Sequence, residues 1–383
     1  MYKFKVGVAG LGFIGMVHFE ALRRLPCVEV VAVCESEDIA KEKAKSLAVE
    51  KYYSDFNKML KECDLDCVHI CTPNNLHYPM AKSALTANVH VVCEKPLALS
   101  KAEADELAAL AKEKGLVNVT NYNIRFYPLV HQLKAMIKNG DLGEVRWVTG
   151  SYLQDWLLYE TDYNWRLDSR YSGESMTVAD IGSHWLDLME FVTGRGVSEV
   201  IGDFKTTYPT RKKPKKAVET FSGKTLAPSD YEDVPVSVED SANIMFRLKN
   251  GGKGTLTVNQ CFAGKKNSLS ISVVGSKKSA TWDSERPDEI WLGNRDGANQ
   301  VLMRDPSLLY PEAIALIGAP GGHVEGFADT FKQLYEKVYA HIKSAEDGSV
   351  SYPDFPTFDD GAHEMAIIEK IIESSKKGMW VKV

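Results

Sequence analysis

A lysine follows a short apolar segment of the chain, in the tripeptide Glu94-Lys95-Pro96. Residues 89–93, VHVVC, have the composition of a short buried strand. If that strand belongs to a parallel sheet, its carboxyl end lies where such sheets bind their ligands. An ammonium group at this place is either a surface charge or a catalytic group. The motifs elsewhere in the chain must distinguish between these two interpretations.

A carboxylate and an imidazole stand four residues apart in Asp180-Ile181-Gly182-Ser183-His184. We expect a helix from Asp180 to beyond residue 190, so both side chains would lie on one helical face. A carboxylate beside an imidazole fixes its tautomer and raises its basicity, which suits removal of a proton from an alcohol. The same spacing is typical of a capping aspartate followed by a packed histidine, and it leaves both interpretations open.

The start of the chain gives these groups a context. Gly10, Gly12 and Gly15 form a G-x-G-x-x-G pattern between a predicted strand at 3–9 and a predicted helix at 14–24. Gly10 would allow the tight turn, Gly12 would let the backbone approach a pyrophosphate, and Gly15 would let helix and strand pack closely. The amino end of the helix would then offer free N–H groups to the phosphates.

The residue after the second predicted strand, at 28–34, is Glu35. A carboxylate at this place can accept both ribose hydroxyls of an adenosine, and it would repel a 2′-phosphate. We therefore expect NAD as the cofactor, with NADP left open. The alternative is that Glu35 caps a helix that begins near Asp38.

Strands and helices continue to alternate through the first third of the chain. Strands are predicted at 66–71, 89–93 and 117–121, and helices at 76–87 and 101–114. This order predicts a doubly wound parallel sheet of the Rossmann type over residues 1–122. The polar residues at two strand ends would share a rim with the glycine loop: Thr72, Asn74, His77, Glu94 and Lys95. A histidine at a helix start, such as His77, more often has a structural role.

From residue 123 to residue 383 the pattern changes. A helix at 128–139 precedes predicted strands at 145–152, 199–206, 243–248, 254–263 and 268–275, and an amphipathic helix at 360–376 ends the chain. Hairpin-like spacing predicts an α+β domain with a large, mainly antiparallel open sheet. This domain would bind the substrate, and the outer face of its sheet would pair with another subunit.

The composition excludes several classes of protein. The formal net charge is −6, which argues against nucleic-acid binding. No apolar run approaches the roughly 20 residues that span a bilayer, so we expect no membrane partner. Seven scattered cysteines without a C-x-x-C pair are typical of free thiols in the cytoplasm. The histidines and cysteines show no metal-ligand spacing, and the basic cluster at 211–216 is predicted to be a solvated loop, with an anion or partner contact as the alternative.

Taken together, the motifs resemble the glucose–fructose oxidoreductase / inositol dehydrogenase (Gfo/Idh/MocA) family. The resemblance covers nearly the whole chain and rests on four motifs and on residues 123–128, NIRFYP, which are similar to the family's segment between its domains. The four motifs are Gly10-Leu11-Gly12-Phe13-Ile14-Gly15, Thr72-Pro73-Asn74-Asn75-Leu76-His77, Glu94-Lys95-Pro96 and Asp180-Ile181-Gly182-Ser183-His184.

The resemblance implies roles for individual residues. Lys95 would hydrogen-bond the reacting hydroxyl, His184 would be the general base, and Asp180 would orient it or bind a substrate hydroxyl. Hydride would move from the substrate carbon to the nicotinamide C4. The implied cofactor-binding residues are Gly10, Gly12, Phe13, Ile14, Gly15, Glu35, Thr72, Pro73, Asn74, His77, Glu94, Lys95 and Asn123.

Family members act mostly on sugars, inositols and related polyols. Asp155, Trp156, Trp165, Arg166 and His323 are therefore candidate substrate residues beside Asp180 and His184, since aromatic rings stack on sugars while charged groups bind hydroxyls. The alternative is that they belong to packed loops and a turn. The resemblance also implies a homodimer or homotetramer.

Two further functions remain open on the sequence. One is an enzyme that keeps NAD bound and uses it in an internal redox cycle, as in the processing of glycosides or anhydrosugars. The other is a non-catalytic protein that senses NAD, which the presence of Lys95, Asp180 and His184 disfavours.

Overall fold

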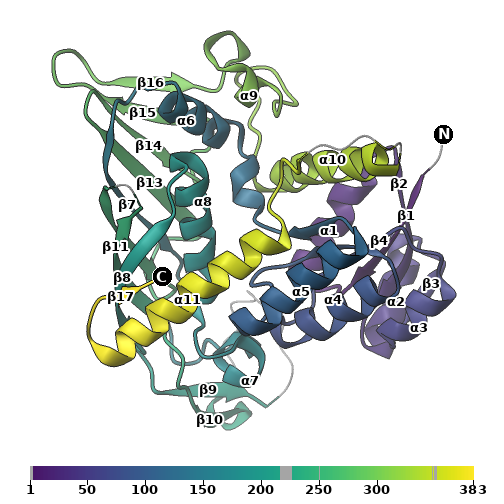
Figure 1. Cartoon of the computed structure of the whole chain (residues 1–383). Helices are drawn as coiled ribbons and strands as arrows, with labels where there is room; N and C mark the ends of the chain where they lie inside the picture. Colours follow the sequence, from purple (N-terminus) through teal and green to yellow (C-terminus); the bar gives the residue numbers. More distant parts are fainter. Residues whose placement is uncertain (1–2, 216–226, 250, 347, 349–351) are drawn as a thin grey trace. The chain divides into compact units, whose positions relative to one another are not determined.

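The computed structural model describes residues 3–215, 227–249, 251–346, 348 and 352–383 (Figure 1). The chain divides into two compact units, and each unit is made of two separate stretches. Unit 1 comprises Met1–Asn123 and Phe327–Met365, and unit 2 comprises Ile124–Gly326 and Ala366–Val383. The sequence analysis did not predict the return of the chain to the first unit.

Unit 1 contains a six-stranded parallel sheet with the order β3-β2-β1-β4-β5-β6. Its strands are β1 (Phe4–Ala9), β2 (Val28–Cys34), β3 (Lys51–Tyr53), β4 (Cys67–Ile70), β5 (His90–Cys93) and β6 (Asn118–Thr120). This strand order is that of the Rossmann fold and confirms the predicted doubly wound sheet.

The helices of unit 1 lie on both faces of this sheet (Figure 1). They are α1 (Phe13–Arg23), α2 (Glu37–Leu47), α3 (Phe56–Glu62), α4 (His77–Thr86), α5 (Lys101–Lys114) and α10 (Phe327–Glu346). Helices α1 and α10 pack on the same face. Rings of α10 touch β1 and β4 there, with Tyr339 against Phe4 and Tyr335 against His69.

Unit 2 is built on a nine-stranded sheet with the order β16-β15-β14-β13-β7-β12-β11-β8-β17. Its strands are β7 (Val145–Leu153), β8 (Val197–Lys205), β11 (Ser241–Leu248), β12 (Lys253–Asn259), β13 (Ser268–Gly275), β14 (Ser279–Asp283), β15 (Glu289–Gly293), β16 (Gln300–Met303) and β17 (Val381–Lys382). Strands β7 and β12 pair in parallel, whereas the other neighbours pair antiparallel. The large, mainly antiparallel sheet is therefore confirmed.

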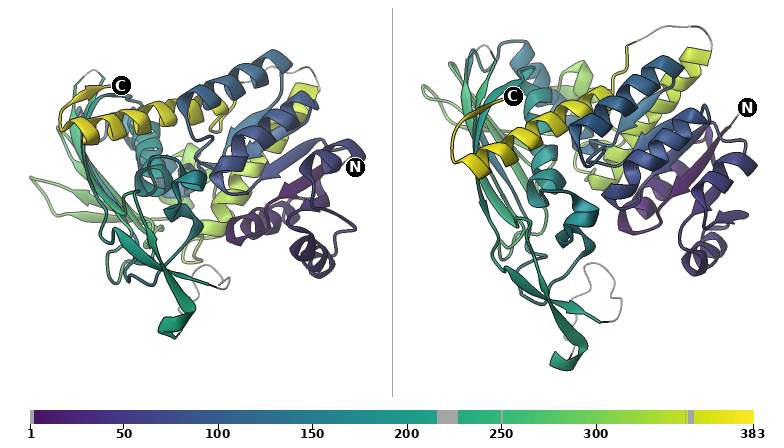
Figure 2. Two further views of the ribbon diagram at one scale, coloured as in Figure 1. Left: turned by 90° about the horizontal axis from the view of Figure 1, so that it is seen from below. Right: turned by 60° about the horizontal axis from the view of Figure 1, so that its bottom comes forward.

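Helices α6 (Pro128–Lys138) and α8 (Ser183–Thr193) cover one face of this sheet, and no described helix covers the other (Figures 1 and 2). Alternation along the strands explains this asymmetry. In β11, Ala242, Ile244, Phe246 and Leu248 are buried toward the helices, whereas the intervening side chains face outward. The indole of Trp185 in α8 packs on Phe246 and donates to Ser270 O.

The segment before α8 is a π-helical turn, Val178–Gly182, rather than the α-helix that the sequence predicted. The N–H of Ser183 donates to Val178 O, five residues earlier. Single π turns occur often at functional sites. The predicted pair Asp180 and His184 therefore spans a π turn and the first turn of α8.

The basic cluster at 211–216 corrects a prediction. Residues Thr210–Pro214 form strand β9, which pairs with β10 (Tyr231–Pro235), and the side chain of Arg211 is fully buried. The cluster is thus not a solvated loop, because one of its charges lies in the interior of unit 2; Lys216 lies outside the described residues.

The remaining helices are α7 (Ser169–Ser172), α9 (Pro311–Ile314) and α11 (Phe358–Lys377). In the described part of the chain, no helix is long and apolar enough to cross a membrane. All seven cysteines are free thiols, and Cys34, Cys67, Cys71 and Cys93 are buried as predicted.

Candidate active site

The glycine loop between β1 and α1 has the geometry that its sequence predicted. Gly10 has a φ of +87°, and a Cβ there would lie 2.6 Å from the backbone of Cys71. A Cβ on Gly15 would lie 1.8 Å from Gly10 O. Both positions therefore require glycine, one for the turn and one for the contact of α1 with the loop.

Gly12 differs from the other two glycines because a Cβ there would meet nothing within 4 Å. It is the N-cap of α1, and no side chain caps this helix. Open space beside a bare helix amino end fits the pyrophosphate of a dinucleotide. Phe13 and Ile14 begin the helix, and the ring of Phe13 is exposed.

The carboxylate of Glu35 faces this loop from the end of β2. Its Oε2 accepts from Leu11 N at 2.9 Å, and its Oε1 accepts from Ser36 N at 2.9 Å. Helix α2 begins at Glu37 with Ser36 as its N-cap. The position beside the glycine loop fits a group that binds an adenosine ribose, and it does not fit the alternative of a helix cap.

The motif from Thr72 to His77 joins β4 to α4. His77 is buried, with Nδ1 2.7 Å from Pro96 O and Nε2 2.9 Å from Thr72 O. Because a carbonyl oxygen only accepts, both contacts are hydrogen bonds only when the ring carries two protons. Burial lowers the pKa of His77 and opposes that form, while the two carbonyl groups favour it. His77 thus connects the ends of β4 and β5, and Pro73 and Asn74 lie in the turn between them.

The Glu94-Lys95-Pro96 segment leaves the end of β5 through a cis peptide bond between Lys95 and Pro96. Glu94 is buried, and Lys95 is partly buried. The Glu94 carboxylate lies 2.9 Å from His18 Nε2, and it accepts from Asn121 Nδ2 at 2.5 Å and from Lys95 N at 3.2 Å. Lys95 therefore projects from a backbone that buried polar groups hold in place.

Asn123, predicted to bind the cofactor, is buried and donates to Thr330 Oγ1 at 2.8 Å.

In unit 2, a network of polar side chains surrounds the Asp180 carboxylate. Arg166 Nε donates to one oxygen at 3.3 Å, and Gln260 Nε2 donates to the other at 2.9 Å. Gln260 also donates to Gln154 Oε1 at 3.1 Å, and Arg166 donates to Asn164 Oδ1 at 3.3 Å. The structure therefore brings together the predicted residues Asp180 and Arg166, and it adds Gln154, Asn164 and Gln260.

A buried carboxylate, Glu239, holds the π turn that carries Asp180. It accepts from Ser175 Oγ at 2.6 Å, Val178 N at 2.9 Å and Met176 N at 3.2 Å. Burial raises the pKa of Glu239, while these donors lower it. The carboxylate satisfies N–H groups that the start of a helix leaves without an internal partner.

His184 lies in the first turn of α8, and 8% of its surface is exposed. Its ring centroid is 6.4 Å from that of Tyr152 on β7. Burial raises the pKa of the Tyr152 phenol, which keeps it neutral and a hydrogen-bond donor to Asn267. An imidazole that is nearly buried but still reached by solvent suits a general base.

The other predicted substrate residues lie in different settings. Trp156 Nε1 donates to Gln154 Oε1 at 2.8 Å, and the indole of Trp165 packs against the guanidinium of Arg166 at 4.4 Å. The carboxylate of Asp155 pairs with Lys266 at 2.6 Å. His323 is exposed in a loop, and its backbone carbonyl accepts from Arg304.

The buried Arg211 supports the segment that carries Asp155 and Trp156. Its Nη1 donates to the carbonyl oxygens of Leu157, Tyr159 and Asp162 at 3.1, 2.8 and 3.2 Å. Its Nη2 pairs with the Asp240 carboxylate at 3.1 Å. Arg211 thus fixes a loop of the predicted substrate region without itself being part of the predicted site.

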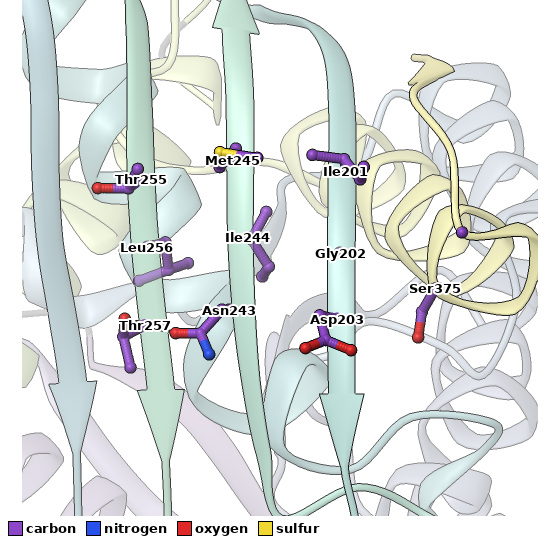
Figure 3. A pocket seen from close by; sticks show the side chains of 11 residues that line it. Ile201, Gly202, Asp203, Asn243, Ile244, Met245, Thr255, Leu256, Thr257 and Ser375 are labelled. Carbon is purple, nitrogen blue, oxygen red and sulfur yellow. Dashed lines mark hydrogen bonds between the residues drawn. The ribbon is translucent and has the colours of Figure 1, made fainter.

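A hollow of about 550 Å³ lies elsewhere in unit 2 (Figure 3). Side chains of β8, β11 and β12 line it, including Asp203, Asn243, Met245 and Thr257, with Ser375 at the end of α11. Asn243 and Met245 are on the outer face of the sheet, opposite the face that carries α8 and His184. The hollow is therefore not part of the candidate active site.

The residues of each unit fit the predicted ligands. The open space at Gly12, the amino end of α1 and Glu35 can hold the phosphates and ribose of NAD. Among the described residues, no group of three or more histidine, cysteine, aspartate or glutamate side chains could hold a metal ion.

Two protein-family models match the chain. The model described as an oxidoreductase family with an NAD-binding Rossmann fold matches residues 4–122, and the GFO/IDH/MocA C-terminal domain matches residues 130–281.

Similar proteins extend over the full length of the chain. Levoglucosan dehydrogenase of Pseudarthrobacter phenanthrenivorans is 29% identical and aligns over 100% of this chain and 99% of its own. Myo-inositol 2-dehydrogenase of Thermotoga maritima is 26% identical over 91% of both chains. The solved structure of levoglucosan dehydrogenase in complex with NADH and L-sorbose superposes with a TM-score of 0.87, at 26% identity, over 100% of this chain and 99% of that chain.

Proposed function

Because the chain belongs to the Gfo/Idh/MocA family, whose N-terminal domain is an NAD-binding Rossmann fold, we propose that it is a sugar or polyol dehydrogenase. It is an NAD-dependent oxidoreductase of CH–OH groups, and the proposal adds the class of substrate. Similarity to levoglucosan and inositol dehydrogenases supports that class. When bound, NAD would supply the hydride acceptor, and the side chains of this chain would handle the proton and the orientation of the substrate.

The residues of unit 1 would bind the cofactor and present the ammonium group. Gly12 and the amino end of α1 would hold the pyrophosphate, and Glu35 would accept the ribose hydroxyls and disfavour NADP. Lys95 would donate to the substrate oxygen as that oxygen loses its proton. A cation at this point stabilises negative charge as it develops.

The residues of unit 2 would accept the proton and hold the sugar. His184 would be the general base, and Asp180 would orient it or bind a neighbouring hydroxyl. Arg166 and Gln260 keep the Asp180 carboxylate in one orientation. Trp156 and Trp165 would offer aromatic surface to a sugar ring, with Asp155 and His323 as further contacts.

The observation that carries the proposal is the setting of Lys95. The segment with this lysine follows a parallel strand of the sheet that also carries the glycine loop, and Glu94 and His77 hold its backbone through one partly buried and one buried hydrogen bond. A surface lysine would need no such support. This favours a catalytic group over a surface charge.

The direct test is reduction of NAD, followed by absorbance, with levoglucosan, myo-inositol and a panel of glycosides and free sugars. We expect turnover with at least one sugar or polyol, and faster turnover with NAD than with NADP. No reduction of either cofactor with any of these compounds would contradict the proposal. Turnover of a glycoside without net NADH, with cofactor retained through purification, would instead indicate the internal redox cycle.

The role of Lys95 has its own test in Lys95→Met. We expect kcat to fall by about a hundredfold or more, because a stabilising charge next to the reacting oxygen is lost. NADH affinity, measured by fluorescence titration, should change far less. Lys112→Met, an exposed lysine of α5, is the matched control. An equal loss of turnover and NADH affinity in Lys95→Met would contradict the assigned role.

We also propose that the open face of the nine-stranded sheet pairs with a second copy of the chain. Several large apolar side chains on this face are at least 38% exposed: Trp147, Met245, Val274, Trp291, Val301 and Met303. The strand register puts them on one face, between rows of hydroxyls such as Thr149 and Thr255, which are 2.7 Å apart. An apolar patch with hydroxyl rows is typical of a symmetric interface.

Light scattering on the purified chain tests this pairing. We expect the mass of a dimer or tetramer, and a shift toward the monomer in Trp291→Glu. The mass of one chain for the unchanged protein would contradict the proposal.

A cytoplasmic location is proposed as well, because all seven cysteines are free thiols.

A further inference from the structure

A chain of buried polar side chains extends from the Glu94 carboxylate through the interior of unit 1. His18 Nε2 lies 2.9 Å from Glu94 Oε1, His18 Nδ1 lies 3.0 Å from His69 Nδ1, and His69 Nε2 lies 2.9 Å from Tyr339 OH. His18 and His69 have no exposed surface, and Tyr339 has 1%. Such groups are costly to bury, so their arrangement calls for an explanation.

The donors and acceptors fix the direction of this chain. Glu94 accepts from Lys95 N and Asn121 Nδ2 as well as facing His18, and two donors on one carboxyl group favour its anion. His18 then donates through Nε2, so its Nδ1 must accept from His69 Nδ1. The His69 Nε2 is left as an acceptor, and the hydroxyl of Tyr339 donates to it. Every group is satisfied with both imidazoles neutral.

The protonation of His69 agrees with this direction. Burial lowers the pKa of His69 well below its usual value, and the neighbouring His18 lowers it further. The groups that face the two rings are Tyr335 and Tyr339 of α10 and the Glu94 carboxylate, and Cys67 of β4 lies beside the Tyr339 hydroxyl. Burial keeps both phenols neutral by raising their pKa values, so they remain donors.

We propose that His18, His69 and Tyr339 are positioning residues for Lys95. They form a row of hydrogen bonds that all donate in one direction, from Tyr339 through His69 and His18 to Glu94. This row keeps Glu94 an anion and fixes the peptide from which Lys95 projects. The effect of the row on catalysis rests on the proposed function of Lys95, whereas the direction of its hydrogen bonds does not. The opposite direction would require a protonated Glu94 that donates to His18, and both histidines would then carry the other tautomer.

The first test measures the tautomers directly and needs no substrate. The full-length protein is labelled with ring-¹⁵N histidine, and the signals of His18 and His69 are assigned among the nine histidines with His18→Gln and His69→Gln. At pH 7.5 we expect the Nε2-H tautomer for His18 and the Nδ1-H tautomer for His69. The reverse pair of tautomers, or an imidazolium at either residue, would overturn the proposed direction.

The second test asks whether the hydrogen bonds from Tyr339 to Glu94 position Lys95. Tyr339→Phe removes only the hydroxyl at the far end, and we expect kcat to fall about tenfold, while KM and NADH affinity change less than about twofold. His18→Leu should cost more than His18→Gln, which keeps a donor for Glu94. Tyr52→Phe, at a half-exposed tyrosine of β3, is the matched control.

The outcomes of the two tests distinguish the positioning role of these residues from the direction of their hydrogen bonds. If Tyr339→Phe and His18→Leu fold and retain an unchanged kcat, the positioning role is refuted, even if the tautomers are as expected. If the unchanged protein turns over no sugar, the proposed function fails, and the tautomers still decide the direction of the chain. A lowered unfolding temperature with unchanged kcat would assign these residues a purely structural role.

Discussion

Arg211→Met should strongly destabilise unit 2, although it removes a residue from a cluster that looks like a basic surface loop. The guanidinium and its partner Asp240 are at most 1% exposed. Among the described residues, Thr207 N and Thr207 Oγ1 then remain as the donors to the buried carboxylate of Asp240, and three loop carbonyls lose the guanidinium as a donor. Removing one partner of a buried pair costs about 3–5 kcal/mol of unfolding free energy.

For a unit of this size, 1 kcal/mol corresponds to about 2–4 °C in unfolding temperature, so a fall of roughly 6–20 °C is expected. Thermal unfolding followed by circular dichroism or calorimetry measures this shift. Lys212→Met is the matched control, since Lys212 pairs with Asp233 at the surface, where such a pair contributes about 0–1 kcal/mol. Asp240→Asn added to Arg211→Met should restore part of the loss, because no unpaired charge then remains buried.

The reasoning would be refuted if Arg211→Met lowered the unfolding temperature no more than Lys212→Met does. It would also be refuted if Asp240→Asn made the Arg211→Met protein less stable. Once a substrate is known, the remaining folded Arg211→Met protein should show a raised KM with a smaller change in kcat, because the loop from Leu157 to Asp162 lies between the predicted binding residues Trp156 and Trp165 and carries no proposed base.

Four further substitutions test the cofactor site and the buried His69. Gly12→Ala should leave the unfolding temperature nearly unchanged but weaken NADH binding about tenfold or more. Gly15→Ala should lower both the unfolding temperature and the NADH affinity, because its Cβ would lie 1.8 Å from Gly10 O. Thermal unfolding and NADH titration of the two variants measure these effects. Glu35→Ser should narrow the preference for NAD over NADP in titrations with both cofactors, and an unchanged ratio would contradict its role. Burial lowers the pKa of His69, so as the pH falls the unfolded chain binds a proton on this residue before the folded protein does. The free energy of unfolding should therefore fall as the pH drops below about 6.5, by up to about 1.4 kcal/mol per pH unit. In urea titrations at several pH values, His69→Gln should show a weaker dependence of the unfolding free energy on pH.

The Rossmann unit could be predicted from the sequence because its signals are local. Short apolar runs end at glycine, proline or asparagine, as at Gly10 and Pro73, and the helices between them have the expected period. The observed strands β1, β4 and β5 differ from the predicted ranges by one residue at most at each end. The motif that carries Lys95 was equally visible, because a polar tripeptide directly follows a strand.

The parts that were missed depend on contacts between distant segments. Glu239 and Gln260 hold the region around Asp180 from more than 50 residues away, and no spacing in the sequence connects them to it. No signal in the sequence marks Glu239, because it continues the polar positions of a segment whose apolar positions are Val234, Val236 and Val238. Arg211 stands next to Lys212 and Lys213, which pair with carboxylates at the surface, and its buried partner Asp240 distinguishes it.

The π turn at Val178–Gly182 has no signature in the sequence, because its bond from Ser183 N to Val178 O depends on packing rather than on residue type. The spacing of Asp180 and His184 suggested an α-helix, and the two kinds of turn place residues four apart on nearly the same face. The proposed pair was therefore compatible with both.

The order of the chain in unit 1 has a consequence for biosynthesis. The nascent chain completes β1 to β6 by residue 120, but α10, with Tyr335 and Tyr339, is synthesised only after some two hundred further residues. Until then the face of the sheet that carries His69 lacks part of its cover, and the polar network behind Glu94 is unfinished. A nascent or truncated chain that ends near residue 122 would therefore expose buried polar and aromatic groups and be a natural client for chaperones, so that the nucleotide-binding unit cannot be completed before α10 is synthesised although its sequence comes first.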